Sequence, residues 1–183
     1  MLDFALLAHQ CAPEIHPNTL AHVIQVESGY NPFAIGIVGA HLERQPRNRG
    51  EAIATAAWLE AKHYNYSVGL GQVNKNNFAK YGLSIEVAFD PCPNLQAAAA
   101  ILKDCYERAL RSQPDQQAAL RDSFSCYYSG NFTTGYKAGY VLKVVTGVGG
   151  GTKHHQLTDK TPSARDPKTT TANAETTKSA LMF

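Results

Sequence analysis

The sequence predicts a mainly α-helical fold, and three observations support this class. Apolar residues recur at helical spacing in short segments, and Pro, Gly and Asn residues separate these segments. Of the 183 residues, 44% are hydrophobic and 17% are charged, a mixture typical of a globular protein with a packed core. The predicted helices span about residues 2–10, 17–28, 49–62, 74–80, 94–111, 114–129 and 134–145.

Local residues indicate where some of these helices begin and end. Pro17 and Pro114 suit a first helical turn, where the missing backbone N–H is not needed. Ser112, with Asp115 three residues later, loosely resembles a capping box. Gly147 is suited to close the last helix, because glycine readily adopts the left-handed conformation common at helix ends.

Two stretches and the C-terminal segment differ from the helical pattern. Residues 34–38 and 66–68 contain β-branched or aromatic residues near glycines and lack a helix start signal, which predicts a small β-ribbon. From residue 146 onward the composition changes to Thr, Lys, Gly, Ala and Pro. We therefore expect one domain over residues 1–145 and a flexible tail over 146–183.

The charge distribution excludes some partners. Residues 146–183 contain five Lys/Arg and three Asp/Glu, which leaves twelve of each charge in residues 1–145. A neutral body lacks the basic surface that tracks a phosphate backbone, so nucleic acid is not an expected partner. No stretch is long and apolar enough to predict a membrane span.

The four cysteines, Cys11, Cys92, Cys105 and Cys126, predict disulfides rather than a metal site. They are even in number and show no CxxC or Cys/His spacing of a zinc site. Two disulfides in an oxidising compartment are expected, with three pairings open; four reduced core thiols are the alternative. The seven histidines, including His154-His155 in the tail, show no convincing metal spacing. We expect neither a metal nor a cofactor.

Glu27 occupies a position patterned for the core. Leu20, Val23 and Ile24 mark the buried stripe of helix 17–28, and the i, i+3, i+4, i+7 series continues to Glu27. Residues 28–32 should end the helix just after it, near the negative end of the helix dipole. Both burial and the dipole disfavour the ionised form, so we expect a raised pKa and a role as general acid. The alternative is an exposed last-turn residue on a differently phased helix.

Three motifs in order resemble the soluble lytic transglycosylases. Residues 27–32, Glu-Ser-Gly-Tyr-Asn-Pro, resemble the first motif of that family, and residues 69–72, Gly-Leu-Gly-Gln, resemble the second, Gly-Leu-Met-Gln. Residues 126–130, Cys-Tyr-Tyr-Ser-Gly, resemble the third, Ala-Tyr-Asn-Ala-Gly. Asp90-Pro91 and Asn94 open a long helix before the third motif, as in the family. The resemblance covers roughly residues 13–130 and implies a lysozyme-like fold.

The sequence is most similar to the members of this family encoded with type IV secretion systems. It shares with them Cys-Ala-Pro at 11–13, Gln-Val-Glu-Ser-Gly at 25–29 and Phe-Asp-Pro-Cys at 89–92. This similarity implies a periplasmic or cell-envelope enzyme that opens peptidoglycan locally for the secretion or conjugation apparatus. Its partners would be the glycan strand and, through the C-terminal tail, components of the secretion system.

The sequence departs from the family at several positions. Residues 41–66 separate two segments that are closely joined in relatives, so they resemble an insertion carrying its own helix. Gly36 takes the place of a serine that contacts substrate in relatives, and Ser67 is a candidate replacement. Gly71 stands for the Met of the second motif, and Tyr128 for the Asn of the third. These changes concern contacts to substrate rather than the chemistry.

The resemblance also implies a mechanism with one acid/base. Ordinary glycosidases use two carboxylates, whereas here Glu27 would protonate the bond between N-acetylmuramic acid and N-acetylglucosamine. It would then accept the proton of the C6 hydroxyl as a 1,6-anhydro ring closes. Intramolecular attack provides a high effective concentration, so water need not be activated. The residues expected to contact substrate are Ser28, Tyr30, Ser67, Gln72 and Tyr127.

Other interpretations of these residues remain open at this point. Tyr127 also fits a buried core tyrosine, and Gln72 a loop-capping amide. Tyr30, Phe33, Tyr64 and Tyr66 could face sugar rings or pack in the core. For the whole chain the alternatives are a hydrolytic goose-type lysozyme and a non-enzymatic wall-binding assembly factor.

Overall fold

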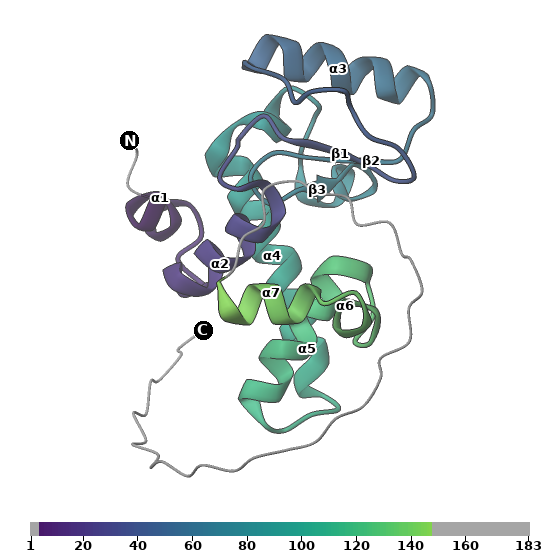
Figure 1. Cartoon of the computed structure of the whole chain (residues 1–183). Helices are drawn as coiled ribbons and strands as arrows, with labels where there is room; N and C mark the ends of the chain where they lie inside the picture. The colour runs from purple at the N-terminus through teal and green to yellow at the C-terminus, as the bar shows by residue number, and fades with distance from the viewer. Residues whose placement is uncertain (1–3, 148–183) are drawn as a thin grey trace, which may run out of the picture.

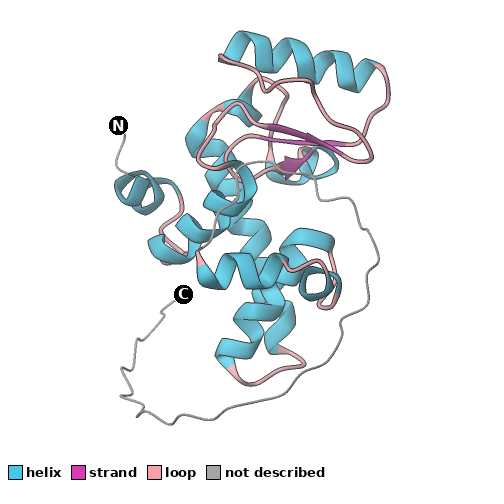
Figure 2. Ribbon diagram, viewed as in Figure 1, coloured by secondary structure: helices cyan, strands magenta, loops and turns pink. Residues whose placement is uncertain are grey.

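The computed structural model describes residues 4–147, and the predicted tail beyond residue 147 lies outside them. The predicted fold class is confirmed: the protein is mainly helical, with one small antiparallel sheet (Figure 2). The α-helices are α1 (Phe4–Cys11), α2 (Pro17–Ser28), α3 (Arg49–Ala61), α4 (Pro91–Leu110), α5 (Gln116–Ser129), α6 (Thr134–Lys137) and α7 (Tyr140–Thr146). Three short 3₁₀-helices are η1 (Lys75–Asn77), η2 (Ala79–Tyr81) and η3 (Val87–Phe89).

Helix α4 runs through the middle of the molecule and separates two groups of elements (Figure 1). On one side, α1, α2, α5 and α7 pack around α4 through a cluster that includes Leu20, Leu102 and Val144. On the other side, the sheet and α3 form a second cluster that includes Leu59, Tyr66 and Phe89. Two hydrophobic cores thus share one helix, which fixes the positions of their surfaces relative to each other.

The sheet consists of β1 (Ile35–Ile37), β2 (Tyr66–Val68) and β3 (Val73–Asn74), with β2 in the centre. The predicted ribbon is therefore present, with Ile35 opposite Val68 and Gly36 opposite Ser67; β3 was not predicted. At the outer edge of β1, the side-chain amide of Gln45 forms the two hydrogen bonds that a neighbouring strand would form. Its Oε1 accepts from the Ile35 N–H at 2.8 Å, and its Nε2 donates to the Ile35 carbonyl at 3.0 Å. This amide pairs backbone groups that an edge strand leaves open.

The predicted insertion, residues 41–66, contains α3 and the first residue of β2. Asn48 caps α3 by accepting a hydrogen bond from the Glu51 N–H at 3.0 Å. Ala52, Ala56 and Leu59 then form its buried side, which packs in the same core cluster as Tyr66 and Val68 of β2. Because residues alternate along a strand, Ser67 points to the opposite face of the sheet.

Helix α2 has the ends that its sequence predicts. Pro17 occupies its first turn, and the ring of His16 accepts a hydrogen bond from the Asn18 N–H at 3.2 Å. Gly29 ends the helix in the left-handed conformation, at φ 58°. Leu20, Val23 and Ile24 are buried, so the predicted phase of the helix is correct.

Several predicted boundaries are wrong, each for a local reason. Residues 74–80 do not form an α-helix; Asn74 caps a 3₁₀ turn instead, by accepting from the Asn76 N–H at 3.1 Å. Helix α5 begins at Gln116, because Asp115 is its cap and accepts from the Ala118 N–H at 2.6 Å. Pro114 therefore precedes the helix, and the capping box with Ser112 does not form. Gly139, at φ 71°, divides residues 134–145 into α6 and α7.

Two disulfides confirm the prediction from the cysteine count and select one of the three pairings. Cys11–Cys92 joins α1 to the start of α4, and Cys105–Cys126 joins α4 to α5. Gly147 ends α7 at φ 65°, as expected. In the described part of the chain, no helix combines the length and the apolar character needed to cross a membrane.

Candidate active site

A groove of about 600 Å³ lies where the two groups of elements meet. Its lining comes from the end of α2, the three strands and η1, one residue of α4, and the end of α5. Four of the six predicted site residues line it: Glu27, Ser67, Gln72 and Tyr127. Among its lining residues, all within the described chain, Glu27 is the only acidic one and none is basic. The groove therefore suits a polar substrate without a strong negative charge.

Glu27 lies in the last turn of α2, with its carboxyl group held against α7. The Tyr140 hydroxyl donates to Glu27 Oε1 at 2.5 Å. Burial raises the pKa of Glu27 from 4.5 to about 7, and the hydrogen bond from Tyr140 opposes this rise only in part. The raised pKa expected from the sequence is confirmed, although burial and not the helix dipole is its main cause. Near neutral pH, this carboxyl group can hold a proton and release it.

Two tyrosine hydroxyls accompany Glu27. Tyr127 donates to the Gly71 carbonyl at 2.6 Å, and its ring packs against both hydrophobic clusters. Burial, and the charge of Glu27 when it is ionised, hold the pKa of Tyr127 and of Tyr140 far above 10. Both hydroxyls therefore stay protonated and can act as hydrogen-bond donors.

Gln72 follows the tight turn of residues 69–71 and has a left-handed backbone, at φ 47°. Its Nε2 donates to the Ala34 and Gly69 carbonyls, both at 3.0 Å, so this nitrogen caps the loop, as the alternative interpretation expects. Its Oε1 lies 2.8 Å from where a Cβ of Gly36 would be. A serine at position 36 would therefore require the end of the Gln72 side chain to shift.

Ser67 lies directly across the sheet from Gly36, the position at which the family resemblance implies a serine. Ser67 and Gly36 are direct partners across β1 and β2, so their side-chain positions lie on the same, groove-facing side of the sheet. Asn74 on β3 orients the side chains of Ser67 and Asn65. Its Nδ2 donates to Ser67 Oγ at 3.2 Å and to Asn65 Oδ1 at 2.8 Å. The hydroxyl hydrogen of Ser67 and the amide hydrogens of Asn65 are then available to a ligand.

The loop that carries Gln72 is held by Asn94, a side chain that is only 1% exposed. Its Oδ1 accepts from the Gly71 N–H at 2.8 Å, and its Nδ2 donates to the Val68 and Ala88 carbonyls at 3.0 and 2.8 Å. A Cβ at Gly71 would lie 2.5 Å from Ala98 Cβ. The Met that the family has at this position therefore has no room here.

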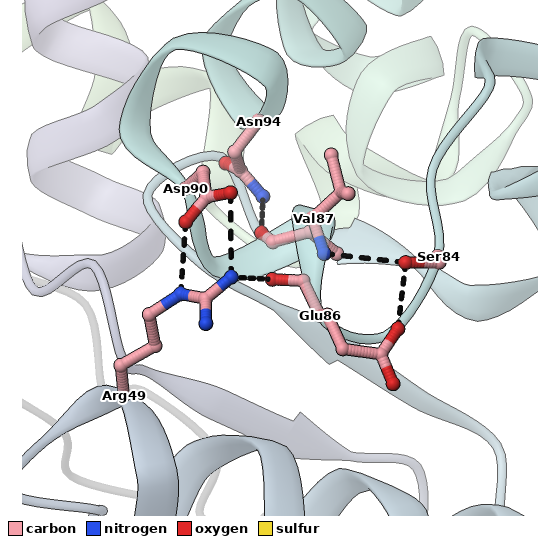
Figure 3. A network of polar contacts seen from close by, with 7 residues as sticks. Arg49, Ser84, Glu86, Val87, Asp90 and Asn94 are labelled. Carbon is pink, nitrogen blue, oxygen red and sulfur yellow. Dashed lines mark hydrogen bonds and ion pairs between the residues drawn. The ribbon is translucent and has the colours of Figure 1, made fainter.

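An ion pair joins this network to α3. Figure 3 shows the Arg49 side chain reaching both the Asp90 carboxylate and the Glu86 carbonyl, beside Asn94. The distance from Arg49 Nε to Asp90 Oδ1 is 2.9 Å. Both side chains are partly exposed, so the pair contributes little energy, but it connects α3 to the start of α4.

Two predicted site residues are not brought to the groove. Ser28 Oγ donates back to the Ile24 carbonyl at 3.3 Å, within its own helix. Tyr30 donates to the Ala21 carbonyl at 3.1 Å and packs edge-on against Phe4. Neither residue lines the groove.

The other candidate aromatic residues lie elsewhere as well. Tyr66 is fully buried in the cluster beneath α3, and Phe33 packs against the same cluster. Tyr64 stacks on Trp58 outside the groove. Tyr66 and Phe33 thus pack in or against the core, which was one of the two alternatives for these aromatic residues.

Tyr140, which holds the carboxyl group of Glu27, was not predicted as a site residue from the sequence. A usable signal was present: Tyr140, Val141 and Val144 follow the spacing of a buried helix face, and a buried tyrosine hydroxyl needs a polar partner. Asn65 and Asn74 were missed as well. Within residues 4–147, no three His, Cys, Asp or Glu side chains come together in a way that could hold a metal ion.

A protonated carboxyl group facing a polar groove, beside two tyrosine hydroxyls, is an arrangement for general acid catalysis on a neutral polar substrate. Fold and groove thus define a lysozyme-like class of protein, and the sequence comparison agrees: the chain belongs to the transglycosylase SLT domain family, which matches residues 5–139. No solved structure matches it at a significant level.

Among its relatives are proteins named virB1 from Brucella and Agrobacterium. "Type IV secretion system protein virB1" of Brucella abortus biovar 1 and its counterpart in Brucella suis biovar 1 are each 54% identical over 151 residues, which cover 79% of this chain and 63% of the relative. "Protein virB1" of Agrobacterium fabrum is 38% identical over 146 residues, covering 79% of this chain and 58% of that protein. The chain thus spans somewhat less than two thirds of these relatives.

Proposed function

We propose that this protein is a peptidoglycan lytic transglycosylase that acts in the cell envelope for a type IV secretion or conjugation apparatus. One observation carries the proposal: a single carboxyl group, with its pKa raised to about 7, faces a groove that has no second acidic residue. The family and the secretion-system relatives support the same assignment. The two disulfides favour an oxidising compartment such as the periplasm.

The proposed reaction uses Glu27 twice. As an acid it protonates the oxygen between N-acetylmuramic acid and N-acetylglucosamine, and the glycosidic bond breaks. As a base it then accepts the proton of the C6 hydroxyl of the muramic acid, whose oxygen attacks C1 and closes a 1,6-anhydro ring. A pKa near 7 suits both steps, because the proton is neither too tightly nor too loosely held.

The rest of the groove positions the glycan in this proposal. Ser67 and Asn65 donate hydrogen bonds to acetamido or hydroxyl oxygens, and Gln72 Oε1 accepts one from a sugar hydroxyl or N–H group. Tyr127 keeps the loop of Gln72 in place through the Gly71 carbonyl. Uncharged sugar rings fit a lining whose only acidic or basic side chain is Glu27.

Mass spectrometry of digested peptidoglycan tests the function. The native chain should release muropeptides that end in 1,6-anhydro-N-acetylmuramic acid, and Glu27→Gln should release none. Glu43→Gln, which removes an exposed carboxylate outside the groove, is the matched control and should digest like the native chain. Products with free reducing ends would instead identify a hydrolytic lysozyme, and release of no products would contradict the enzymatic assignment.

A further inference from the structure

Tyr128 is a groove residue to which the proposed mechanism gives no role. It follows Tyr127 near the end of α5, lines the groove and is 49% exposed. Its ring stacks on that of Tyr140, with 4.8 Å between the centroids and 24° between the planes. Tyr140 in turn holds Glu27. The ring of Tyr128 therefore lies one side chain away from the acidic group.

The stacking fixes how Tyr128 is presented. Since Tyr140 covers one face of the ring, the exposed part of Tyr128 is the other face and the edges. Tyr140 is itself only 5% exposed and belongs to the core cluster of α2, α5 and α7, so it is a rigid support. A ligand that contacts the free face does not have to order a mobile side chain, which lowers the entropic cost of binding.

We propose that Tyr128 is a stacking platform for a pyranose ring of the glycan strand, in the subsite next to Glu27. The carbon-bound hydrogens on one face of a pyranose form a flat apolar surface that an aromatic face can cover. The hydroxyl and acetamido groups at the ring edges then remain free for the donors of Asn65 and Ser67 on the strand side of the groove. The inference rests on the proposed function, whose substrate it details.

The identity of residue 128 supports this assignment. A tyrosine at this position presents a broad apolar face as well as a hydroxyl group to the groove. One face of the Tyr128 ring packs on Tyr140, while the side chain as a whole stays 49% exposed in the groove. The free face is thus a surface that a ligand can cover.

Binding of a soluble oligosaccharide tests the platform. The probe is a tetramer of β-1,4-linked N-acetylglucosamine, titrated calorimetrically into the full chain carrying Glu27→Gln, so that no turnover occurs. In this background Tyr128→Asn should weaken binding about tenfold, the size expected when one aromatic contact is lost. Tyr128→Phe keeps the ring and should bind within about twofold of the parent.

The chain offers a matched control in Tyr64. This tyrosine is also partly exposed, at 40%, and also stacks on an aromatic ring, that of Trp58, with 5.9 Å between the centroids. It does not line the groove. Tyr64→Asn should therefore leave tetramer binding unchanged, and thermal melting of each variant checks that the fold is intact.

Three results would overturn the platform: Tyr128→Asn binding as tightly as the parent, Tyr128→Phe binding as weakly as Tyr128→Asn, or a parent chain that does not bind the tetramer. The second would assign the effect to the hydroxyl group instead of the ring face. Digestion by the native chain separates this inference from the proposed function. Anhydro products combined with unaltered binding by Tyr128→Asn would leave the function standing and remove the platform alone.

Discussion

Glu27 shows how one side chain can be placed by a pattern and tuned by its surroundings. Its position after Leu20, Val23 and Ile24 directs it toward the packed side of α2, although a carboxylate there is costly. The protein meets this cost by keeping the proton to a higher pH and by supplying one donor, the Tyr140 hydroxyl. The same environment that makes Glu27 a usable acid therefore makes it a destabilising residue when it is ionised.

This conflict predicts a pH-dependent gain of stability in Glu27→Gln. Below pH 4.5 Glu27 is protonated in both the folded and the unfolded chain, so its ionisation does not affect the free energy of unfolding. As the pH rises from 4.5 through about 7 the unfolded chain ionises first, so native stability falls by about 3 kcal/mol. Glutamine does not ionise. Urea denaturation at pH 4 and pH 8 should show the advantage of Glu27→Gln growing by about this amount, and a constant difference would contradict the buried carboxyl group.

Tyr140→Phe should change the pH dependence of catalysis as well as its rate. The acid form of Glu27 is needed first, so activity should fall as the pH rises through about 7. The hydrogen bond from Tyr140 favours the ionised form, and its loss should move this alkaline limb about one unit higher. The rate at the optimum should fall, because the carboxyl group loses its orientation. Rates of peptidoglycan digestion from pH 5 to pH 9 measure both effects, and a limb that moves to lower pH would contradict the assigned role.

The short segments on the sheet side of the groove are built from side-chain hydrogen bonds more than from regular structure. The turn of residues 69–72 is held from three directions, by Asn94, by Tyr127 and by the amide of Gln72. Asn74 links β2 to β3 in the same way. The contacts of Asn94 and Tyr127 with this turn join residues 23 and 56 positions apart, which short windows of sequence do not record. The helix predicted over 74–80 fails for a local reason, because the Asn74 side chain caps a 3₁₀ turn.

Asn94→Leu should destabilise the protein strongly. The substitution keeps a similar volume but removes the three buried hydrogen bonds that Asn94 forms with the Gly71 N–H and with the Val68 and Ala88 carbonyls. A loss of about 3 kcal/mol in the free energy of unfolding is expected, measured by urea denaturation. Asn76→Leu, at an exposed position, is the control and should change stability by less than about 0.5 kcal/mol. Equal effects of the two substitutions would mean that Asn94 does not hold the loop.

For the molecule as a whole, the groove depends on two cores that meet along α4. Figure 1 shows α4 passing between the group that contains α3 and the sheet and the group that contains α2, α5 and α7. Tyr127 packs against both clusters, so the residues of the groove keep their spacing only if both cores stay docked on α4. Both disulfides also include a cysteine of α4, and they tie α1 and α5 to this shared helix.

Loss of the disulfides should therefore reduce stability substantially. The bridges close loops with sequence separations of 81 and 21 residues. Chain-entropy estimates give about 4.5 kcal/mol for the longer loop and about 3 kcal/mol for the shorter, against a total stability of about 5–15 kcal/mol for a typical domain. Thermal melts of Cys11→Ala/Cys92→Ala and Cys105→Ala/Cys126→Ala should show large drops in Tm, with the larger drop for the first pair. Insensitivity of the native chain to dithiothreitol would contradict a structural role.

Local periodicity and residue chemistry were enough to predict the helical class, the phase of α2, the pairing of the two main strands and the presence of two disulfides. These features depend on neighbours a few residues away, or on the count of one residue type, and such information is contained in short windows. The motifs around Glu27, Gln72 and Tyr127 also follow from short windows, because each includes the turn or helix end that presents the side chain.

Tertiary packing was needed for the rest. Tyr140 becomes the partner of Glu27 although 113 residues separate them, and Asn94 reaches a loop 23 residues away. Ser28 and Tyr30, close to Glu27 in sequence, turn away from the groove, and their hydroxyls donate to backbone carbonyls of α2. A side chain's direction in a folded protein depends on which distant groups can satisfy it, and no local pattern records those distances.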